Sequence, residues 1–378
     1  MTISTIGILG GGQLGRMLAL AGYPLGLRFH IYDPAPDAPA GHLAEHIAAP
    51  YDDMAALEHF GACVDVVTYE FENVPVMTAR ALERFVPVLP PPTALEAAQD
   101  RLVEKRFFQT LGIPTAPFAP VDDRVSFEAA LAQIGLPAVL KTRRLGYDGK
   151  GQAFLHDATA AKTAWNELGG QPLILEGYVA FARELSVLAV RGHDGAIACY
   201  PLVENLHRGG ILRRSIAPAP ALDPEVQALA ETYARRILEA LKYIGVLAIE
   251  LFEIKHPPRD MEGQATQPRL MASEMAPRVH NSGHWTIEGA VTSQFENHLR
   301  AISGVPLGIT DACGYAAMVN IIGELPDVAA LLALPHTHLH LYGKAARPGR
   351  KIGHVTVCAD TREELAGRLA RVEEIVEQ

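Results

Sequence analysis

The sequence predicts a mixed fold, α/β at its N-terminal end and α+β over the rest of the chain. Three observations predict it. Residues 1–90 alternate short apolar runs with helical segments, residues from about 137 hold longer apolar runs with few helices between them, and the last 70 residues return to short mixed elements. The first pattern is typical of a parallel sheet covered by helices, and the second of antiparallel sheets.

The N-terminal part is expected to form a βαβ unit. Its apolar runs predict strands at 3–9, 27–32 and 64–70, with helices near 13–22, 52–61 and 75–84. The proline run LPPPT at 89–93 ends this pattern. Residues 94–114 then predict one or two helices, which Gly112 and Pro114 stop.

The central part is expected to be rich in strands, at PAVLKTR, PLILEGYV, RELSVLAVRG, AIACYPLVENL and GVLAIELFEI. Helices are predicted near 157–168 and 224–241, and the second places Val226, Leu229, Tyr233, Ile237 and Leu241 on one face. The loop 256–268 has the composition of a hairpin tip. The C-terminal part predicts strands within 338–342 and 354–360 and a helix near 361–376.

Composition limits the function classes. The formal charge of −10 over 378 residues argues against a nonspecific nucleic-acid binder, because phosphate contacts need a basic surface. Four widely spaced cysteines without a C-x-x-C pair indicate free thiols in a reducing compartment. No apolar stretch has the length of a membrane span, and no signal peptide is recognisable. We therefore expect a cytoplasmic protein without membrane or nucleic-acid partners.

A glycine pattern follows the first predicted strand. In GILGGGQLGRML, Gly10, Gly12 and Gly15 form G-x-G-x-x-G, and Asp33 ends the next apolar run. Alone, this is a dinucleotide-binding fingerprint, with a helix N-terminus for pyrophosphate and an acid for the ribose. A nicotinamide enzyme built on it would leave the later polar motifs of the chain unexplained.

The later motifs favour phosphate and metal chemistry. The stretch KTRRLGYDGKGQ at 141–152 combines glycines with Arg and Lys, a composition suited to wrapping phosphate oxygens. Strand alternation is expected to place Glu250 with Ala248 and Phe252, and Glu274 with Ala272 and Ala276. Two carboxylates on neighbouring strands would suit Mg²⁺.

Two further polar stretches complete the set. PRVHNSGHW at 277–285 carries Arg278, His280, Asn281, Ser282 and His284, which could bind a small anion. Zinc is disfavoured there, because a helix is unlikely and a third ligand is not evident. YGKAARPGRKIGH at 342–354 places cations around a Pro-Gly turn, as a phosphate clamp would. For each of these motifs considered singly, the alternative to a binding site is an ordinary polar segment on the protein surface.

Taken in order, the motifs resemble one family over nearly the whole chain. GGGQLGRML, TYEFENVP, KTRRLGYDGKGQ, EGYV, APRVHNSGHWT, QFENHLRAI and RPGRKIGHV are similar to those of the 5-(carboxyamino)imidazole ribonucleotide synthases, ATP-grasp enzymes of purine biosynthesis. The resemblance implies a Rossmann-like pre-ATP-grasp domain at 1–100, an ATP-grasp domain at 101–307 with a mobile lid at about 116–180, and a small C-terminal domain at 308–378. It also suggests a homodimer.

The implied reaction uses ATP, Mg²⁺, bicarbonate and 5-aminoimidazole ribonucleotide. Bicarbonate would attack the γ-phosphoryl group to give carboxyphosphate, which would deliver CO₂ to the exocyclic amine. A closing lid would protect this intermediate from water.

The resemblance implies nucleotide contacts at Arg101, Lys141, Gly146, Tyr147, Asp148, Gly149, Lys150, Gly151, Gln152, Glu176, Gly177, Tyr178, Val179, Glu184, His207, Ser273 and Glu274. Among these, Glu176, Tyr178 and Val179 would lie at the adenine, and Glu184 at the ribose. Glu250 and Glu274 would bind Mg²⁺. The family commonly has Asn-Glu where this chain has Ser273-Glu274, so a second Mg²⁺ site is expected to be weaker here.

The resemblance also implies the substrate contacts. Arg278, His280 and Asn281 would hold bicarbonate and then carboxyphosphate, and Asp148 would take the amine proton. The implied ribonucleotide contacts are Gln13, Leu14, Glu72, Asn73, Tyr147, Lys344, Arg347, Arg350 and Lys351, with Lys344 also counted as catalytic. The phosphate expected at the glycine turn then belongs to this substrate, and Asp33 caps the turn at Pro34.

Two alternatives remain beside the nicotinamide enzyme. A formate-using glycinamide ribonucleotide transformylase would share the ATP residues but would lack RVHNSGHW followed by RPGRK. A nucleotide-binding regulator without turnover would not need Asp148, Lys344 and the paired glutamates.

Overall fold

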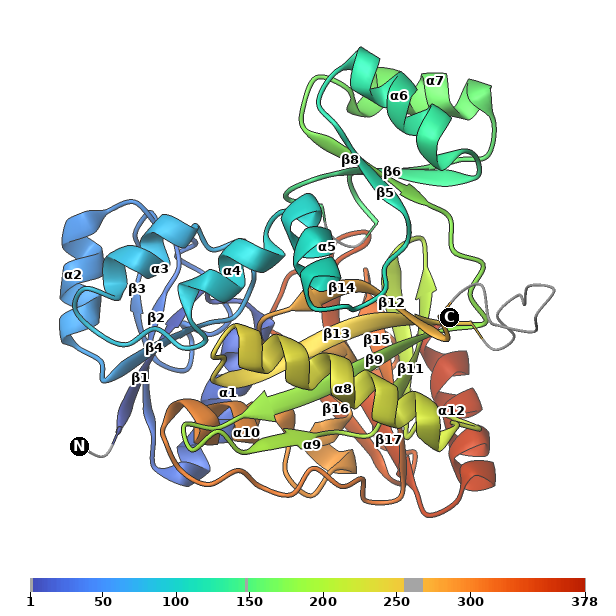
Figure 1. Ribbon diagram of the computed structural model, residues 1–378. Coiled ribbons are helices and arrows are strands. Elements are labelled where there is room, and N and C mark those ends of the chain that lie inside the picture. Colours follow the sequence, from blue (N-terminus) through green and yellow to red (C-terminus); the bar gives the residue numbers. More distant parts are fainter. Residues whose placement is uncertain (1–2, 147–148, 255–267, 378) are drawn as a thin grey trace.

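In the computed structural model, which describes residues 3–146, 149–254 and 268–377, the N-terminal residues form a parallel sheet (Figure 1). Its strand order is β3-β2-β1-β4, so β1 is central and buried on both sides. The three predicted strands are confirmed, but β3 was not predicted, because three residues carry little periodicity. The elements are β1 (Thr5–Leu9), α1 (Gln13–Gly22), a 3₁₀ turn (Tyr23–Leu25), β2 (Arg28–Tyr32), β3 (Glu45–Ile47), α2 (Met54–Ala62), β4 (Val66–Tyr69) and α3 (Val76–Leu82).

Two helices connect this sheet to the rest of the chain. They are α4 (Pro92–Ala98) and α5 (Arg101–Thr110), and Asp100 separates them. The Asp100 side chain accepts hydrogen bonds from the backbone N–H groups of Leu102 and Val103, so it caps α5. The same carboxylate binds Arg143 through two hydrogen bonds of 3.0 and 2.8 Å. The start of α5 is thereby fixed against the segment after β6.

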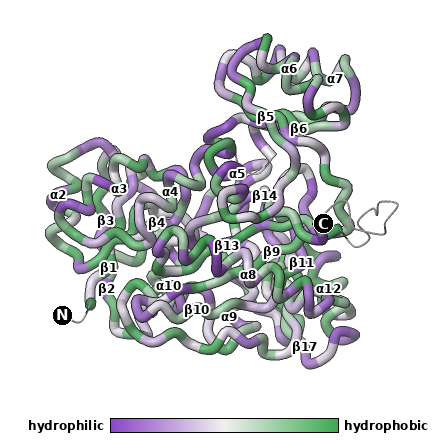
Figure 2. The backbone as a smooth tube through the Cα atoms, in the orientation of Figure 1, coloured by the Kyte–Doolittle hydropathy of each residue, from purple (hydrophilic) through white to green (hydrophobic). Residues whose placement is uncertain are grey.

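A small α+β layer stands out from the body of the molecule at the top of Figure 1. Its antiparallel sheet has the order β5-β8-β6-β7. Two helices cover this sheet, and each carries both hydrophobic and hydrophilic residues (Figure 2), because one side packs on the sheet and the other faces solvent. The elements are β5 (Phe118–Val121), α6 (Arg124–Ile134), β6 (Ala138–Thr142), β7 (Gln152–Leu155), α7 (Ala158–Leu168) and β8 (Leu173–Gly177).

The remaining strands form one large antiparallel sheet, as the sequence predicts. Among the described residues its order is β14-β13-β9-β11-β12-β15-β17-β16, with β10 paired to β9. AIACYPLVENL forms two strands and not one, because Pro201 lacks the N–H that a continuous ladder needs. The strands are β9 (Arg183–Arg191), β10 (Ile197–Cys199), β11 (Val203–Arg208), β12 (Ile211–Ala217), β13 (Gly245–Glu253), β14 (Leu270–Ala276), β15 (Tyr315–Ile322), β16 (Thr337–Leu341) and β17 (Lys351–Ala359).

Helices pack on this sheet around several hydrophobic clusters. In α8 (Pro224–Ala240), Val226, Tyr233 and Ile237 are buried against β9 and β13. Leu229 of the same helix and Leu241, which caps its end, are only partly buried. The C-terminal strands β15 and β17 pack against α12 (Arg362–Val376). The other helices are a 3₁₀ turn (Asn281–Gly283), α9 (Thr286–Gly289), α10 (Gln294–Ile302) and α11 (Val328–Leu332). The predicted hairpin tip falls within 255–267, outside the described residues.

The first and last parts of the chain are both joined to the central sheet. The C-terminal strands continue it, because β15 pairs with β12 from Arg214–Val319 to Ala217–Ala316. The N-terminal sheet joins through α1, whose Leu18 shares a hydrophobic cluster with Phe295 and Leu299 of α10. No helix in the described part of the chain is both apolar and long enough to cross a membrane.

Candidate active site

Glu250 and Glu274 lie opposite each other on β13 and β14. The register then shifts from this pair to Leu251 and Ala272, so Ser273 is the extra residue of a β-bulge. The expectation that Ala272 shares a face with Glu274 is therefore wrong, because an inserted residue breaks the strict alternation of a strand. Ala272 packs in the hydrophobic core with Leu251, whereas both carboxylates lie on the other face.

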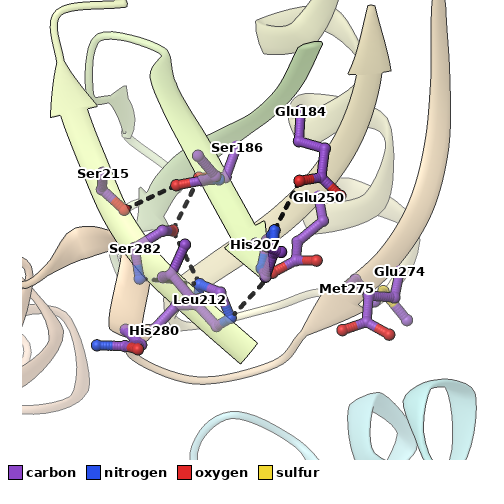
Figure 3. Close-up of polar contacts among 12 residues, drawn as sticks. Glu184, Ser186, His207, Leu212, Ser215, Glu250, Glu274, Met275, His280 and Ser282 are labelled. Atoms are coloured by element: carbon purple, nitrogen blue, oxygen red, sulfur yellow. Dashed lines mark hydrogen bonds and ion pairs between the residues drawn. The ribbon is translucent and has the colours of Figure 1, made fainter. Parts of the chain in front are cut away.

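The two carboxylates lie near each other in Figure 3 and differ in charge environment. Arg101, the first residue of α5, donates to Glu274 at 2.8 Å. Burial would raise the pKa of Glu274, but Arg101 outweighs it and lowers that pKa. Burial and the charge of Glu274 raise the pKa of Glu250. Two facing carboxylates, one of which has a raised pKa, form a site that a further cation would stabilise.

A group of cations surrounds Glu176 at the end of β8. Lys141 of β6 lies 3.0 Å from its carboxylate and Lys105 of α5 lies 3.3 Å away. Burial alone would raise the pKa of Glu176, but the two lysines outweigh it and lower the pKa to about 2. Arg101 also donates to the carbonyl oxygen of Gly146, which ties the glycine-rich loop to this group at 3.3 Å.

Glu184 and His207 face each other on β9 and β11. The Nδ1 atom of His207 lies 2.8 Å from Glu184 Oε2. Burial would lower the pKa of His207, but the hydrogen bond to Glu184 and the charge of Glu250 outweigh it and raise that pKa. This pair lies beside Glu250 in Figure 3.

The segment after β14 holds three of the predicted residues. Arg278 binds Glu72 of the N-terminal part at 2.5 Å, and His280 Nε2 lies 3.4 Å from Glu250 Oε1. Asn281 exchanges two hydrogen bonds with Asn320 of β15, at 3.0 and 2.7 Å. Each residue is thus held by a different part of the chain.

The backbone of this segment is fixed by a single amide side chain. Gln294 of α10 accepts from the N–H of His280 at 2.9 Å and donates to its carbonyl oxygen at 2.6 Å. Gly283 allows this close approach, since a Cβ there would collide with Leu188 and Gln294. The position of His280 is therefore defined by α10 and β9 together.

The cations of the C-terminal loop lie between β16 and β17. Lys344 contacts Gln13 at the start of α1. The charge of Lys351, the first residue of β17, partly opposes the rise in the pKa of Glu250 that burial and Glu274 cause. Arg350 donates to the carbonyl oxygen of Ala345 within the loop, and Arg347 is exposed. The loop thus reaches both the glycine turn and the paired glutamates.

The donors of the glycine turn already have internal acceptors. Glu70, directly after β4, accepts from the N–H groups of Gly12, Leu14 and Gly15 at 2.8, 3.0 and 3.1 Å. Asp33 accepts from Gly11 and Ala35, both at 2.7 Å, so it caps the turn as expected. The N-terminus of α1, expected to meet a substrate phosphate, is thus bound to a carboxylate of the protein itself.

The remaining predicted residues fall near these groups in the fold. The side chain of Leu14 is buried in the hydrophobic core, and Glu72 and Asn73 lie between β4 and α3. The ring of Tyr178, after β8, lies 5.4 Å from that of Phe154 on β7. Gly149, Lys150 and Gly151 lie in the loop before β7, Gln152 begins that strand, and Gly177 and Val179 flank Tyr178. Tyr147 and Asp148 lie outside the described residues.

Three charged residues of the site escaped the sequence analysis. Lys105 is only 1% exposed and donates to the carbonyl oxygen of Ser273 at 2.8 Å. Its neighbour Glu104 is 2% exposed and accepts from the N–H of Met275 at 2.7 Å. Glu70 is the third. A charged pair inside the amphipathic helix 101–110 resembles a solvated face, so only the tertiary structure identifies these residues.

Family models match three consecutive segments of the chain. The ribonucleotide synthetase preATP-grasp domain matches residues 3–99, and the ATP-grasp domain matches residues 106–295. The phosphoribosylaminoimidazole carboxylase C-terminal domain matches residues 316–368.

Relatives match along the whole chain. An N5-carboxyaminoimidazole ribonucleotide synthase of Pseudomonas aeruginosa is 53% identical, covering 98% of this chain and 99% of the relative. A crystal structure of the synthetase from Thermus thermophilus has a TM-score of 0.92 at 55% identity, covering 99% of each chain. Another, from Aspergillus clavatus with ADP and 5-aminoimidazole ribonucleotide, has a TM-score of 0.89 at 30% identity, covering 100% of this chain and 99% of that one. On this evidence the chain belongs to the N5-carboxyaminoimidazole ribonucleotide synthase family of the ATP-grasp superfamily.

Proposed function

We propose that this site uses ATP and bicarbonate to carboxylate 5-aminoimidazole ribonucleotide through carboxyphosphate, with the residue roles given below. The chain is an ATP-dependent ligase of purine biosynthesis, as its family membership establishes. The products are 5-(carboxyamino)imidazole ribonucleotide, ADP and phosphate. The observation that carries the proposal concerns the facing glutamates Glu250 and Glu274, in the middle of the β13–β14 ladder. This pair contacts the cation group through Arg101 and the Arg278–Asn281 segment through His280.

ATP is assigned to the region between the small α+β layer and the large sheet. Lys105, Lys141 and Arg101 carry three positive charges around Glu176 and Glu274, so one is left to offset phosphate. The segment 176–179 would read the adenine edge with its backbone, and Glu184 would accept from the ribose hydroxyls. The loop 146–152 and His207 complete the proposed nucleotide contacts, with Ser273 beside Glu274.

Glu250 and Glu274 are the proposed Mg²⁺ ligands. In the described residues no group of three or more His, Cys, Asp or Glu side chains is placed to hold a metal. Two carboxylates still fit Mg²⁺, since this ion is commonly held by one or two carboxylates together with water and phosphate oxygens. When bound, the ion would neutralise charge on the phosphoryl oxygens. The opposed register of the two glutamates and the raised pKa of Glu250 support this assignment.

Arg278, His280 and Asn281 are assigned to bicarbonate and carboxyphosphate. Burial and the charge of Arg278 hold the pKa of His280 well below its ordinary value, so its ring is neutral. A neutral ring can donate one hydrogen bond to an anion, while Arg278 supplies the charge. Asp148 is the proposed base for the amine.

The ribonucleotide phosphate is assigned to Lys344, Arg350 and neighbouring cations. Lys344 reaches Gln13 across the turn, which supports a site shared between the two ends of the chain. Because Glu70 occupies the N–H groups of Gly12, Leu14 and Gly15, the side chains of the C-terminal loop are expected to contribute more than the turn. Further proposed contacts are Leu14, Glu72, Asn73, Tyr147, Arg347 and Lys351.

The deciding experiment measures ADP release with 5-aminoimidazole ribonucleotide, with and without bicarbonate. We expect turnover that needs both substrates and Mg²⁺. Absence of bicarbonate-dependent turnover would refute the reaction, and formate-dependent turnover would favour the transformylase alternative. Asp148→Asn should abolish carboxylation with nearly unchanged ATP affinity, whereas loss of both would contradict its role as base. A cytoplasmic homodimer is proposed as well, and sedimentation of the full chain would test the dimer.

A further inference from the structure

A row of buried polar side chains runs behind His280 (Figure 3). Ser215 lies on β12, Asn205 on β11, Ser186 on β9 and Ser282 in the 3₁₀ turn after His280. Asn205 is 6% exposed, and the three serines are fully buried. Polar groups so far from water are costly unless each is hydrogen bonded, so the direction of every bond in the row matters.

The row ends on the Nδ1 atom of His280. Ser215 donates to Asn205 Oδ1 at 2.8 Å, and Asn205 Nδ2 donates to Ser186 Oγ at 3.0 Å. Ser186 then donates to Ser282 Oγ at 2.8 Å. Since Ser186 uses its single proton on this bond, Ser282 is the acceptor there and keeps its own proton for His280 Nδ1, 2.8 Å away.

The opposite direction is excluded by one backbone group. If the Asn205 amide were turned over, Ser186 would donate to it and Ser282 would donate to Ser186. The contact between Ser282 and His280 would then need a proton on Nδ1. The backbone N–H of Ser282 already points at that same Nδ1 atom, at 3.3 Å, so two protons would face each other. Only the first direction satisfies every contact.

We propose that Ser282, supported by Ser186 and Asn205, is a positioning residue that holds His280 in the tautomer with its proton on Nε2. Nε2 lies on the side of Glu250, 3.4 Å from its carboxylate, within the site. From there the N–H donates to an anionic oxygen of bicarbonate or carboxyphosphate. The other tautomer would present a lone pair to the same oxygen and repel it. The role of this N–H in the reaction rests on the proposed function. The tautomer itself is a property of the protein without substrates.

The tautomer can be measured directly by ¹⁵N NMR of the full chain with labelled histidine, using His280→Gln to assign the ring signals among fifteen histidines. We expect an unprotonated Nδ1 and a protonated Nε2 in the unaltered protein. A protonated Nδ1 would overturn the proposal, whatever the kinetics show. Ser282→Ala loses the 2.8 Å hydroxyl contact but keeps the longer backbone N–H contact to Nδ1, so we expect part of the ring population to shift to the tautomer with its proton on Nδ1. An unchanged spectrum would overturn the role of the Ser282 hydroxyl.

Kinetics test the consequence. Ser282→Ala should lower kcat/KM for bicarbonate about tenfold or more, because a hydrogen bond to a charged group is weakened, while KM for ATP stays within about twofold. The matched control is Ser303→Ala, whose buried hydroxyl lacks a hydrogen bond among the described residues. Equal losses in both variants, or parallel losses for ATP and bicarbonate, would indicate a merely structural role.

Failure of the proposed function gives a different result. Unaltered protein without bicarbonate-dependent turnover would refute the reaction, and with it the catalytic consequence of the tautomer. The NMR result for Nδ1 would still decide the proton position. If Ser282→Ala does not fold, the spectrum of the unaltered protein and that of Ser186→Ala remain decisive. Ser186→Ala removes the donor that directs the Ser282 proton to His280, so part of the ring population should shift to the tautomer with its proton on Nδ1. An unchanged spectrum would remove Ser186 from the positioning role.

Discussion

The glycine turn after β1 and the group at the end of β8, where Lys105 and Lys141 face Glu176 (termed the hinge), both hold a buried carboxylate among groups that attract anions. They differ in how many of these groups remain available to a ligand. At the turn, Glu70 takes three backbone N–H groups and Asp33 takes a fourth from Gly11. At the hinge, Glu176 faces two lysines, with Arg101 close by. The N–H groups of the turn are bound by the protein's own acids, whereas at the hinge two lysines face a single carboxylate. A glycine pattern therefore does not reveal whether its donors are available.

The largest effect is expected at the hinge. Lys141→Ala should lower kcat/KM for ATP by roughly 100-fold, because a charge placed to bind phosphoryl oxygens is lost. Steady-state ADP release would measure it. Lys162→Ala, on the exposed side of α7, is the matched control. A loss below about threefold would contradict the assignment of the hinge to ATP.

The turn should respond in stability and not in nucleotide binding. Glu70→Gln leaves one oxygen for three N–H donors, so the free energy of unfolding should fall by about 2 kcal/mol. Urea denaturation would measure it, with the exposed Glu45→Gln as control. The affinity for ADP should change by less than about twofold. A large loss of ADP affinity with unchanged stability would show that the glycine turn binds nucleotide, contrary to this expectation.

A third test uses pH. Burial and the charge of Glu274 raise the pKa of Glu104 to about 8, so the folded protein binds a proton that the unfolded chain releases near pH 4.5. Stability from this group is complete below pH 4.5 and is lost as the pH rises to about 8. Glu104→Gln should therefore flatten the fall in unfolding free energy between pH 5 and 8, by up to about 1.4 kcal/mol per pH unit.

Urea titrations at several pH values would measure that slope. Glu128→Gln, an exposed residue of α6, is its control. A slope unchanged by Glu104→Gln but altered by Glu128→Gln would show that Glu104 is ionised in the folded protein.

The smallest effect is expected at the cap. Asp33→Asn leaves a single amide oxygen to accept from the N–H groups of Gly11 and Ala35. The free energy of unfolding should therefore fall by about 1 kcal/mol. Thermal unfolding would detect it, with the exposed Asp37→Asn for comparison. Turnover should be unaffected. A selective loss of turnover would instead place Asp33 at a ligand.

The fold was predictable where a regular spacing of apolar side chains continues over a long stretch of sequence. The βαβ pattern, the α8 face and the antiparallel strands follow from side-chain spacing, which neighbours in sequence determine. Residues 124–134 were missed as a helix, although Asp123 and Ser126 form a capping box at its start. The bulge at Ser273 could not be predicted, because only pairing with β13 defines the extra residue.

The candidate site was predictable through the family resemblance more than through single residues. Motifs point to Glu250, Glu274 and His280, but nothing near Lys105 indicates that α5 packs beside β14 and turns a surface-like lysine inward. Glu70 illustrates the same limit, since it meets Gly12 across 58 residues of chain. Long-range partners of this kind depend on the assembled sheet.

Glu70 also links the tolerance of two distant positions to substitution. A Cβ at position 12 would collide with Glu70 Oε1, so a side chain there would displace the Glu70 carboxylate. An alanine at 12 would therefore need a shifted carboxylate or a shorter residue at 70, and either change would release N–H groups of α1. Substitutions at positions 12 and 70 are therefore expected to depend on each other. A variant meant to bind an outside phosphate at this turn should be designed at both positions.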